Sequence, residues 1–184
     1  MFRILDFLAA FLGLLVFWPL LLVIAVIGFF DTGYPIFVQV RVGRNKKPFK
    51  LIKFRTMPVE TKSVASHLVN YESITRLGAF LRKTKIDELP QLINVIKGEM
   101  SLVGPRPNLF NQKDLIKKRA ALGVYNVRPG ITGLAQIRNI DMSTIELLAK
   151  TDKEMIEALT LKDYFKYILM TVKGRGSGDA VNKD

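Results

Sequence analysis

The sequence predicts a mainly helical α+β protein in which a membrane helix precedes one domain, and three patterns support this prediction. Residues 7–30 are largely apolar and carry no charged side chain. A short stretch of alternating apolar residues follows, and the rest contains helical patterns separated by loops rich in glycine and proline. We therefore expect a membrane helix over residues 1–30, one domain over residues 31–173 and a flexible tail over residues 174–184.

The charge of the chain is strongly biased toward lysine and arginine. Its 184 residues include 28 Lys and Arg against 16 Asp and Glu, which gives a formal net charge of +12. Only Arg3 and Asp6 lie before residue 31, so the excess belongs to the domain. A basic domain favours anionic partners such as nucleic acid, anionic lipid headgroups or phosphorylated substrates. The sequence has no cysteine, which excludes disulfides, thiolate catalysis and cysteine-ligated metals.

The apolar run over residues 7–30 is long enough to cross a bilayer, which takes roughly 20 helical residues. It is too long for the apolar part of a cleaved signal peptide, and no small-residue cleavage site follows it. Pro19 leaves the carbonyl of Leu15 without its helical partner, so we expect a kink there. Arg3 before the run and the basic domain after it both favour the cytoplasmic side. These flanks are equally compatible with a single span and with a helix that bends at Pro19 and returns.

The residues after the membrane segment favour a small β-hairpin and then a short helix. Apolar residues alternate with others over 36–42, and residues 50–54 resume a strand-like pattern after a basic turn at 44–48. A polar, aperiodic stretch over 58–73 indicates a loop, and a helical pattern follows over 75–83.

An acidic pair, Asp87 and Glu88, stands at or just before the start of the next predicted helix. Apolar residues at helical spacing continue to Ile96, and Gly98 is a suitable terminator. Pro90 fits only the first turn, because further into the helix it would remove a hydrogen bond. The free N–H groups and the positive end of the helix dipole favour an ionised carboxylate here and also attract phosphate. On its own, such a pair is more often a helix cap than a catalytic site.

Two rigid loops each present an arginine. Residues 101–107 contain two prolines and a glycine, which exclude a helix, and they carry Arg106. Residues 128–133 form a second glycine-containing loop that begins with Arg128. Arginine forks match phosphate oxygens, and paired carboxylates can hold the divalent ion that neutralises a diphosphate. Together with the basic residues 53–57 and the membrane segment, these loops favour a phosphate-rich substrate and a lipid, although each arginine taken singly is more often a surface charge.

Three further helices are predicted in the C-terminal half. A pattern rich in lysine and arginine covers residues 111–122, and Ser143 with Glu146 forms a capping box for a helix that reaches about Leu159. Thr160 caps the last helix, whose apolar side is flanked by lysines. Such a stripe usually packs on a core, but a basic helix with an aromatic face can also lie in the membrane interface.

Five motifs in order resemble the bacterial sugar transferase family, the small monotopic phosphoglycosyl transferases. The resemblance covers about residues 1–137 and rests on residues 3–6 before the proline-broken helix, 53–57, 87–92, 98–107 and 128–136. It implies transfer of a sugar-1-phosphate from a UDP-sugar to polyprenol (undecaprenyl) phosphate, with release of UMP. It also implies a re-entrant helix broken at Pro19, a Mg²⁺ requirement and a catalytic domain at the cytoplasmic face of the bacterial inner membrane.

The resemblance also assigns roles to individual residues. Asp87 would attack the sugar-bearing phosphorus as the nucleophile and hold the phosphosugar covalently. Glu88 would be a metal ligand or a base toward the lipid phosphate, and both carboxylates are candidate Mg²⁺ ligands. The candidate phosphate- and nucleotide-binding residues are Lys53, Arg55, Arg82, Arg106, Arg128 and Arg138.

Two departures from the family pattern affect single residues. Many members have Ser-Pro at the helix break, whereas this chain has Trp18-Pro19, so the hydroxyl that could bond the freed carbonyl is missing. Many members continue the last motif with Asn-Gly-Arg, whereas Arg138 follows Ile137 directly here. Arg138 is therefore displaced and is the weakest of the phosphate candidates.

The alternative is a non-catalytic, membrane-tethered adaptor whose basic surface binds anionic lipid or nucleic acid. Charge alone favours this alternative. The acidic pair opposes it, because a surface that only binds anions has no use for carboxylates among its arginines. We therefore expect an enzyme with a UDP-sugar, polyprenol phosphate and anionic membrane lipid as partners and without nucleic acid, and a homo-oligomer remains open.

Overall fold

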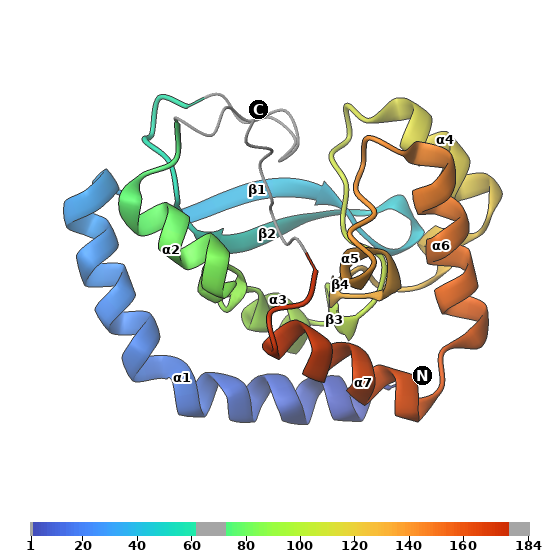
Figure 1. Ribbon diagram of the computed structural model, residues 1–184, viewed down its shortest axis with the longest axis horizontal. Coiled ribbons are helices and arrows are strands. Elements are labelled where there is room, and N and C mark those ends of the chain that lie inside the picture. The colour runs from blue at the N-terminus through green and yellow to red at the C-terminus, as the bar shows by residue number, and fades with distance from the viewer. Residues whose placement is uncertain (1, 62–72, 177–184) are drawn as a thin grey trace.

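The computed structural model describes residues 2–61 and 73–176, so part of the expected loop over 58–73 and most of the expected tail lie outside the described residues. The fold is mainly helical, as predicted, and contains the predicted hairpin and a second small sheet (Figure 1). The elements in chain order are α1 (Arg3–Thr32), β1 (Ile36–Val42), η1 (Arg44–Lys46), β2 (Pro48–Phe54), α2 (Arg76–Thr84), η4 (Ile86–Glu88), α3 (Gln91–Lys97), β3 (Ser101–Val103), α4 (Lys113–Ala121), η5 (Val124–Asn126), β4 (Gly130–Thr132), α5 (Leu134–Ile137), α6 (Ile145–Ala158) and α7 (Leu161–Val172), where η marks a 3-10 helix.

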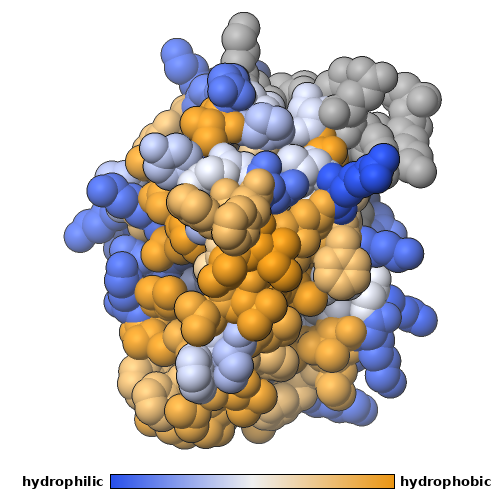
Figure 2. All heavy atoms as spheres, turned by 90° about the vertical axis from the view of Figure 1, so that its left-hand side faces the viewer, coloured by the Kyte–Doolittle hydropathy of each residue, from blue (hydrophilic) through white to orange (hydrophobic). Residues whose placement is uncertain are grey.

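Helix α1 is a single helix of 30 residues that changes direction near its middle, where the sequence has Pro19 (Figure 1). Within the described part of the chain it is the one helix long and apolar enough to cross a membrane. Its second half presents a broad apolar surface (Figure 2) that includes Leu22, Val26 and Phe30. The helix ends at Gly33, whose φ of 75° is easily adopted only by glycine.

The first turn of α1 is bonded to three other elements. Arg3 donates from its terminal nitrogens to the carbonyls of Val95, at 2.5 Å, and Ile96, at 2.8 Å, which lie at the negative end of α3. Asp6 is buried and accepts from the Ser101 hydroxyl, the Leu102 amide and the Tyr164 hydroxyl. Each of these bonds joins residues more than 90 positions apart. The start of α1 is therefore fixed to α3, β3 and α7.

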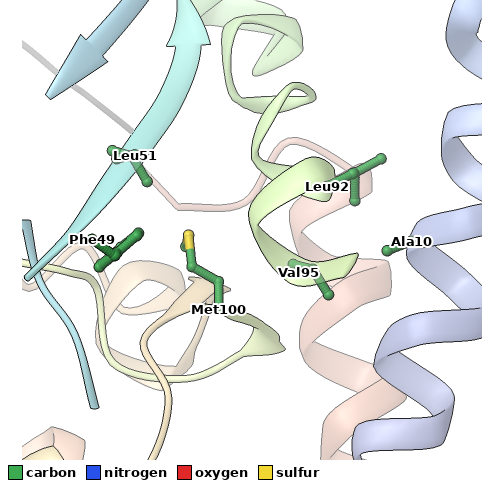
Figure 3. Packing of buried hydrophobic residues seen from close by; sticks show 6 residues of the cluster. All are labelled: Ala10, Phe49, Leu51, Leu92, Val95 and Met100. Atoms are coloured by element: carbon green, nitrogen blue, oxygen red, sulfur yellow. The ribbon is translucent and has the colours of Figure 1, made fainter. Parts of the chain in front are cut away.

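The core beside the membrane helix is built around α3, which lies between α1 and β2 (Figure 3). Leu92 and Val95 of α3 lie toward Ala10 of α1, and the β2 residues Phe49 and Leu51 lie on the other side of the cluster. Met100 fills the space at the end of α3. Burial of these apolar side chains stabilises the fold and fixes the position of α3, the helix that follows the acidic pair in the chain.

The predicted β-hairpin is present, with β1 and β2 antiparallel over the whole register from Ile36 opposite Phe54 to Val42 opposite Pro48. In β1 the alternating apolar residues lie on the exposed side, since Val38 and Val40 are each 49% exposed. The opposite side buries Gln39 and Arg41, and Arg41 donates to the carbonyl of Pro107. The buried face of the hairpin therefore combines polar groups of β1, one of which bonds the arginine loop, with Phe49 and Leu51 of β2, which pack in the core.

The two glycine- and proline-containing loops are not wholly irregular, which corrects the prediction for them. Their strands β3 and β4 pair in parallel, with Ser101 opposite Gly130 and Val103 opposite Thr132. A Cβ atom on Gly130 would lie 2.0 Å from the backbone nitrogen of Gly104, so only glycine permits this approach. The sheet pins the arginine-bearing loops to each other.

The remaining helices agree with the prediction in place and differ in one cap. Thr75 and Thr160 cap α2 and α7 by accepting from the amides of Gly78 and Asp163. The predicted capping box at Ser143 is wrong, because the hydroxyl of Ser143 bonds Asp141 instead of capping α6. Glu146, the expected partner of Ser143 in that box, instead forms an ion pair with Lys118 of α4.

The apolar residues of α7 lie on two faces, one buried against the domain and one exposed. Tyr164 and Tyr167 are buried against the domain, and burial together with the hydrogen bond to Asp6 raises the pKa of the Tyr164 hydroxyl. A second stripe is exposed and consists of Leu161, Phe165, Leu169 and Val172. Since α7 runs along the first half of α1 (Figure 1), its exposed stripe adds to the apolar surface of the membrane helix.

Candidate active site

The acidic pair lies on η4, a separate 3-10 turn directly before α3. Asp87 and Glu88 are only 2% and 5% exposed. Lys85 precedes the turn in the left-handed conformation, with a φ of 59°, and Pro90 follows as the N-terminal cap residue of α3. The pair thus stands just before the helix, as predicted, but it has its own turn instead of the first turn of α3. The short turn between two rigid helices fixes both carboxylates in place.

Arg106 is the arginine that the structure brings directly to the acidic pair. Its Nη2 donates to Oε1 of Glu88 at 2.8 Å, and both side chains are largely shielded from solvent. A charge-assisted bond in such surroundings is stronger than one on the surface. The predicted proximity of an arginine loop and the acidic motif is therefore present in the fold.

A buried network supports the backbone that carries Arg106. Arg119 of α4, which is 1% exposed, donates to the carbonyl of Arg106 at 2.8 Å and to Oδ1 of Asn108 at 3.1 Å. The same guanidinium forms an ion pair with Asp152 of α6 at 2.6 Å. The hydroxyl of Tyr125 donates to Asn108 as well. Sequence reasoning missed this network, because Arg119 looks like the surface lysines and arginines beside it.

Arg82 and the basic end of β2 lie on another side of the turn. Arg82 donates from Nε to the hydroxyl of Thr56 at 2.9 Å. Lys53 and Arg55 both lie near the ring of Phe37, with Nζ at 5.6 Å and Cζ at 5.3 Å from its centroid. This end of β2 packs against η4 and α2. Arg82 and Lys53 thus belong to elements that contact the acidic turn, whereas Arg55 donates from Nε to the carbonyl of Tyr34 before the hairpin.

The other two predicted phosphate residues are engaged elsewhere. Arg128 donates from Nε to the carbonyl of Gly98 at 2.7 Å and lines a different cavity on the far side of β3. Arg138 forms a two-pronged ion pair with Glu154 on the exposed surface. Among the described residues neither arginine has a hydrogen bond or ion pair with the acidic pair.

An apolar cavity of about 340 Å³ connects the acidic turn with the membrane helix. Phe17 and Leu20 of α1 lie on its wall, and Glu88 and Lys85 are its charged lining residues. Burial lowers the pKa of Lys85, while the nearby Glu88 carboxylate opposes this shift. The remaining lining comes from residues 84–102, from β4 and from α7, and consists of Thr84, Ile86, Leu89, Leu92, Leu102, Ile131, Thr132, Ile168, Thr171 and Val172.

The donor set at η4 suits Mg²⁺ that also binds a phosphate-bearing substrate. Within the described residues no group of three or more His, Asp or Glu side chains is placed to hold a metal. Mg²⁺ is commonly held by one or two carboxylates together with water and substrate phosphates, and the two adjacent carboxylates supply that number. Asp87 and Glu88 are therefore compatible with the expected ion.

The cavity brings the Glu88 carboxylate to the same surface as apolar residues of α1. The sequence model for bacterial sugar transferases matches residues 1–176, and the chain belongs to this family. The predicted family is confirmed. The predicted enzyme class, a phosphoglycosyl transferase, agrees with the names of similar proteins.

Three similar proteins illustrate the family. A protein of Haemophilus influenzae named as an uncharacterized sugar transferase is 40% identical over 162 residues, which is 77% of this chain and 34% of that protein. The UDP-glucose:undecaprenyl-phosphate glucose-1-phosphate transferase of Caulobacter vibrioides is 39% identical over 92% of this chain and 67% of its own length. The UDP-N-acetylgalactosamine-undecaprenyl-phosphate N-acetylgalactosaminephosphotransferase of Aeromonas hydrophila is 39% identical over 73% of this chain and 33% of its own length. The chain thus spans from about a third to two thirds of these relatives.

Replacing Arg106 by lysine tests whether its forked guanidinium is needed. Arg106→Lys keeps the positive charge but loses the planar fork that can bond Glu88 and a phosphate together. We expect the turnover of donor substrate to fall at least about tenfold, the ratio that corresponds to one charge-assisted hydrogen bond. Membrane attachment should not change. Arg138→Lys is the matched control on the surface, and equal turnover in both variants would remove Arg106 from the site.

Proposed function

We propose that the protein transfers a sugar-1-phosphate from a UDP-sugar to polyprenol phosphate, with release of UMP. The observation that carries this proposal is the cavity, which joins Glu88 and Lys85 to apolar residues of the membrane helix. A soluble nucleotide sugar and a membrane lipid are two substrates that need this combination of an ionic and an apolar surface. The names of the Caulobacter and Aeromonas relatives support the same pair of substrate classes.

In the proposed reaction Asp87 acts as the nucleophile. A carboxylate oxygen attacks the phosphorus that bears the sugar, and the bond from this phosphorus to the oxygen of UMP breaks. UMP leaves with the electron pair of that bond. An oxygen of the lipid phosphate then attacks the same phosphorus, the bond to Asp87 breaks, and the polyprenol-diphospho-sugar is released. The burial of Asp87 supports this role, since it protects the acyl phosphate from water.

The neighbouring groups have supporting roles in this scheme. Arg106, already bonded to Glu88, provides guanidinium donors for phosphate oxygens, and Arg82 is a further cation near the turn. Asp87 and Glu88 would hold Mg²⁺, which when bound neutralises the diphosphate of the donor. Glu88 also prevents Arg106 from folding away from the turn. The sugar is left open, because the two named relatives differ in it.

We infer that α1 is re-entrant and that the domain lies on the cytoplasmic face of the bacterial inner membrane. Its bend in Figure 1 and the apolar surface shared with α7 support a helix that enters one leaflet and returns. The bonds of Arg3 and Asp6 to the domain support the same topology, because they keep the start of α1 on the side of the domain. The basic domain favours the cytoplasmic side.

The enzyme assay that tests the proposal uses detergent-solubilised full-length chain with polyprenol phosphate, Mg²⁺ and a panel of UDP-sugars. We expect release of UMP with at least one donor and formation of a polyprenol-diphospho-sugar. A membrane-tethered adaptor would release no UMP with any donor and would bind anionic vesicles regardless. Removing Mg²⁺ with a chelator should abolish turnover without changing membrane attachment.

The topology can be tested by replacing Pro19. Pro19→Leu supplies the N–H that the carbonyl of Leu15 lacks, so the helix should straighten and shift toward a span, with loss of activity. Tags before residue 1 and after residue 184 should both be labelled only from the cytoplasmic side in the unaltered chain. Pro19→Leu should expose the first tag to the outside. A first tag already accessible from outside in the unaltered chain would contradict the re-entrant topology.

A further inference from the structure

The apolar cavity contains a cation that has no assigned role, and this cation is Lys85. We propose that Lys85 binds the phosphate of the lipid acceptor while the polyprenol chain lies in the cavity toward α1. This inference rests on the proposed function and specifies how one of its two substrates is held. Lys85 acts here as a binding and positioning residue beside the nucleophile.

The backbone conformation at the end of α2 places Lys85 at the wall of the cavity. Lys85 ends α2 in the left-handed conformation, and its amide donates to the carbonyls of Arg82 and Leu81. Left-handed geometry is uncommon for residues other than glycine and asparagine, so a lysine here carries a conformational cost. The turn lets Lys85 and Glu88 line the same cavity. The ammonium is anchored further by donating to the carbonyl of Arg175, beyond the end of α7.

The charges around the cavity leave Lys85 suited to an anion. Glu88 is already bonded to Arg106, so its carboxylate does not depend on Lys85 for compensation. An ammonium has three donors, and the carbonyl of Arg175 takes one of them. Among the residues that the structure describes, the rest of the lining contains no other cation and is mainly apolar.

The shape of this surface fits an amphiphile with a phosphate head. One end of the cavity has Lys85 beside the acidic turn, and the other reaches Phe17 and Leu20 near the bend of α1. A prenyl chain can lie on the apolar lining, while its phosphate meets the ammonium at the end of the cavity that Glu88 also lines. An apolar lining does not increase the affinity for UDP-sugar, which has no apolar tail.

The binding test compares farnesyl phosphate with farnesol by calorimetric titration of the detergent-solubilised full chain. We expect the unaltered protein to bind the phosphate at least about tenfold more tightly than the alcohol. In Lys85→Met this preference should fall to nearly one, while the affinity for farnesol should stay the same. Lys85→Arg should keep the preference. Lys83→Met is the matched control, because Lys83 is exposed two residues away and does not line the cavity.

A kinetic measurement separates the acceptor from the donor. In Lys85→Met the KM for polyprenol phosphate should rise at least about tenfold, while release of UMP without lipid should keep its rate and amplitude. An unchanged preference for farnesyl phosphate, or an equal loss in the lipid-free release, would overturn the proposal. A retained preference that depends on Lys85 in a protein that turns over no UDP-sugar would instead contradict the proposed function alone.

Discussion

Asp87→Asn should abolish catalysis and leave the fold intact. The amide has nearly the same shape as the carboxylate and can occupy the same buried place on the 3-10 turn, so folding and membrane attachment should survive. Turnover should fall by at least about 10³-fold, because an amide oxygen is a far weaker nucleophile and metal ligand. The measurement is UMP release with the donor that the unaltered protein uses.

A lipid-free reaction tests the covalent step in the same pair of proteins. The unaltered protein with UDP-sugar and Mg²⁺ should release at most about one UMP per enzyme and gain the mass of a phosphosugar. Polyprenol phosphate should remove that mass. Asp87→Asn should show neither effect. If UMP appeared only with lipid and no mass was gained, direct attack by the lipid with a carboxylate as base would replace the covalent scheme.

Replacing Arg119, the buried cation that supports the backbone of Arg106, should cause the largest loss of stability among these variants. Arg119→Met leaves Asp152 buried without its ion-pair partner and frees the carbonyl of Arg106. Breaking a buried pair in this way costs about 3–5 kcal/mol. The thermal unfolding temperature of the detergent-solubilised protein should fall accordingly.

Two further variants make that expectation specific. Arg138→Met breaks an ion pair whose side chains are about half exposed, so it should change stability by about 0–1 kcal/mol. Arg119→Met combined with Asp152→Leu should be more stable than Arg119→Met alone, since no charge remains buried. Equal unfolding temperatures for Arg119→Met and Arg138→Met would show that the buried network does not support the fold.

The sequence predicted those parts of the fold that depend on local signals. Thr75 and Thr160 start helices through bonds to amides three residues later, and Gly98 ends α3 with a positive φ. The acidic pair was placed correctly for the same reason, since its neighbours decide where α3 can begin. A local signal fails where another side chain competes, as Asp141 does for Ser143.

Contacts between distant segments could not be predicted in this way. The pairing of β3 with β4 depends on the close approach of Gly104 and Gly130, and no local sequence pattern predicts this approach. The roles of Arg119 and Lys85 depend likewise on which side chains the fold brings to them. One such contact could have been expected from the sequence. Asp6 is the only acidic residue among the first 30, and a carboxylate beside an apolar helix needs a polar partner.

The bonds at the start of α1 constrain the order in which the protein matures during synthesis. Tyr164, which donates to Asp6, lies 158 residues later in the chain. The first turn of α1 is therefore made long before its partners, and its Asp6 carboxylate must stay hydrated until Ser101 and Leu102 have been made, because an unpaired charge is costly in an apolar environment. The first turn of α1 therefore gains its bonds in two stages, first to α3 and β3 and later to Tyr164 of α7.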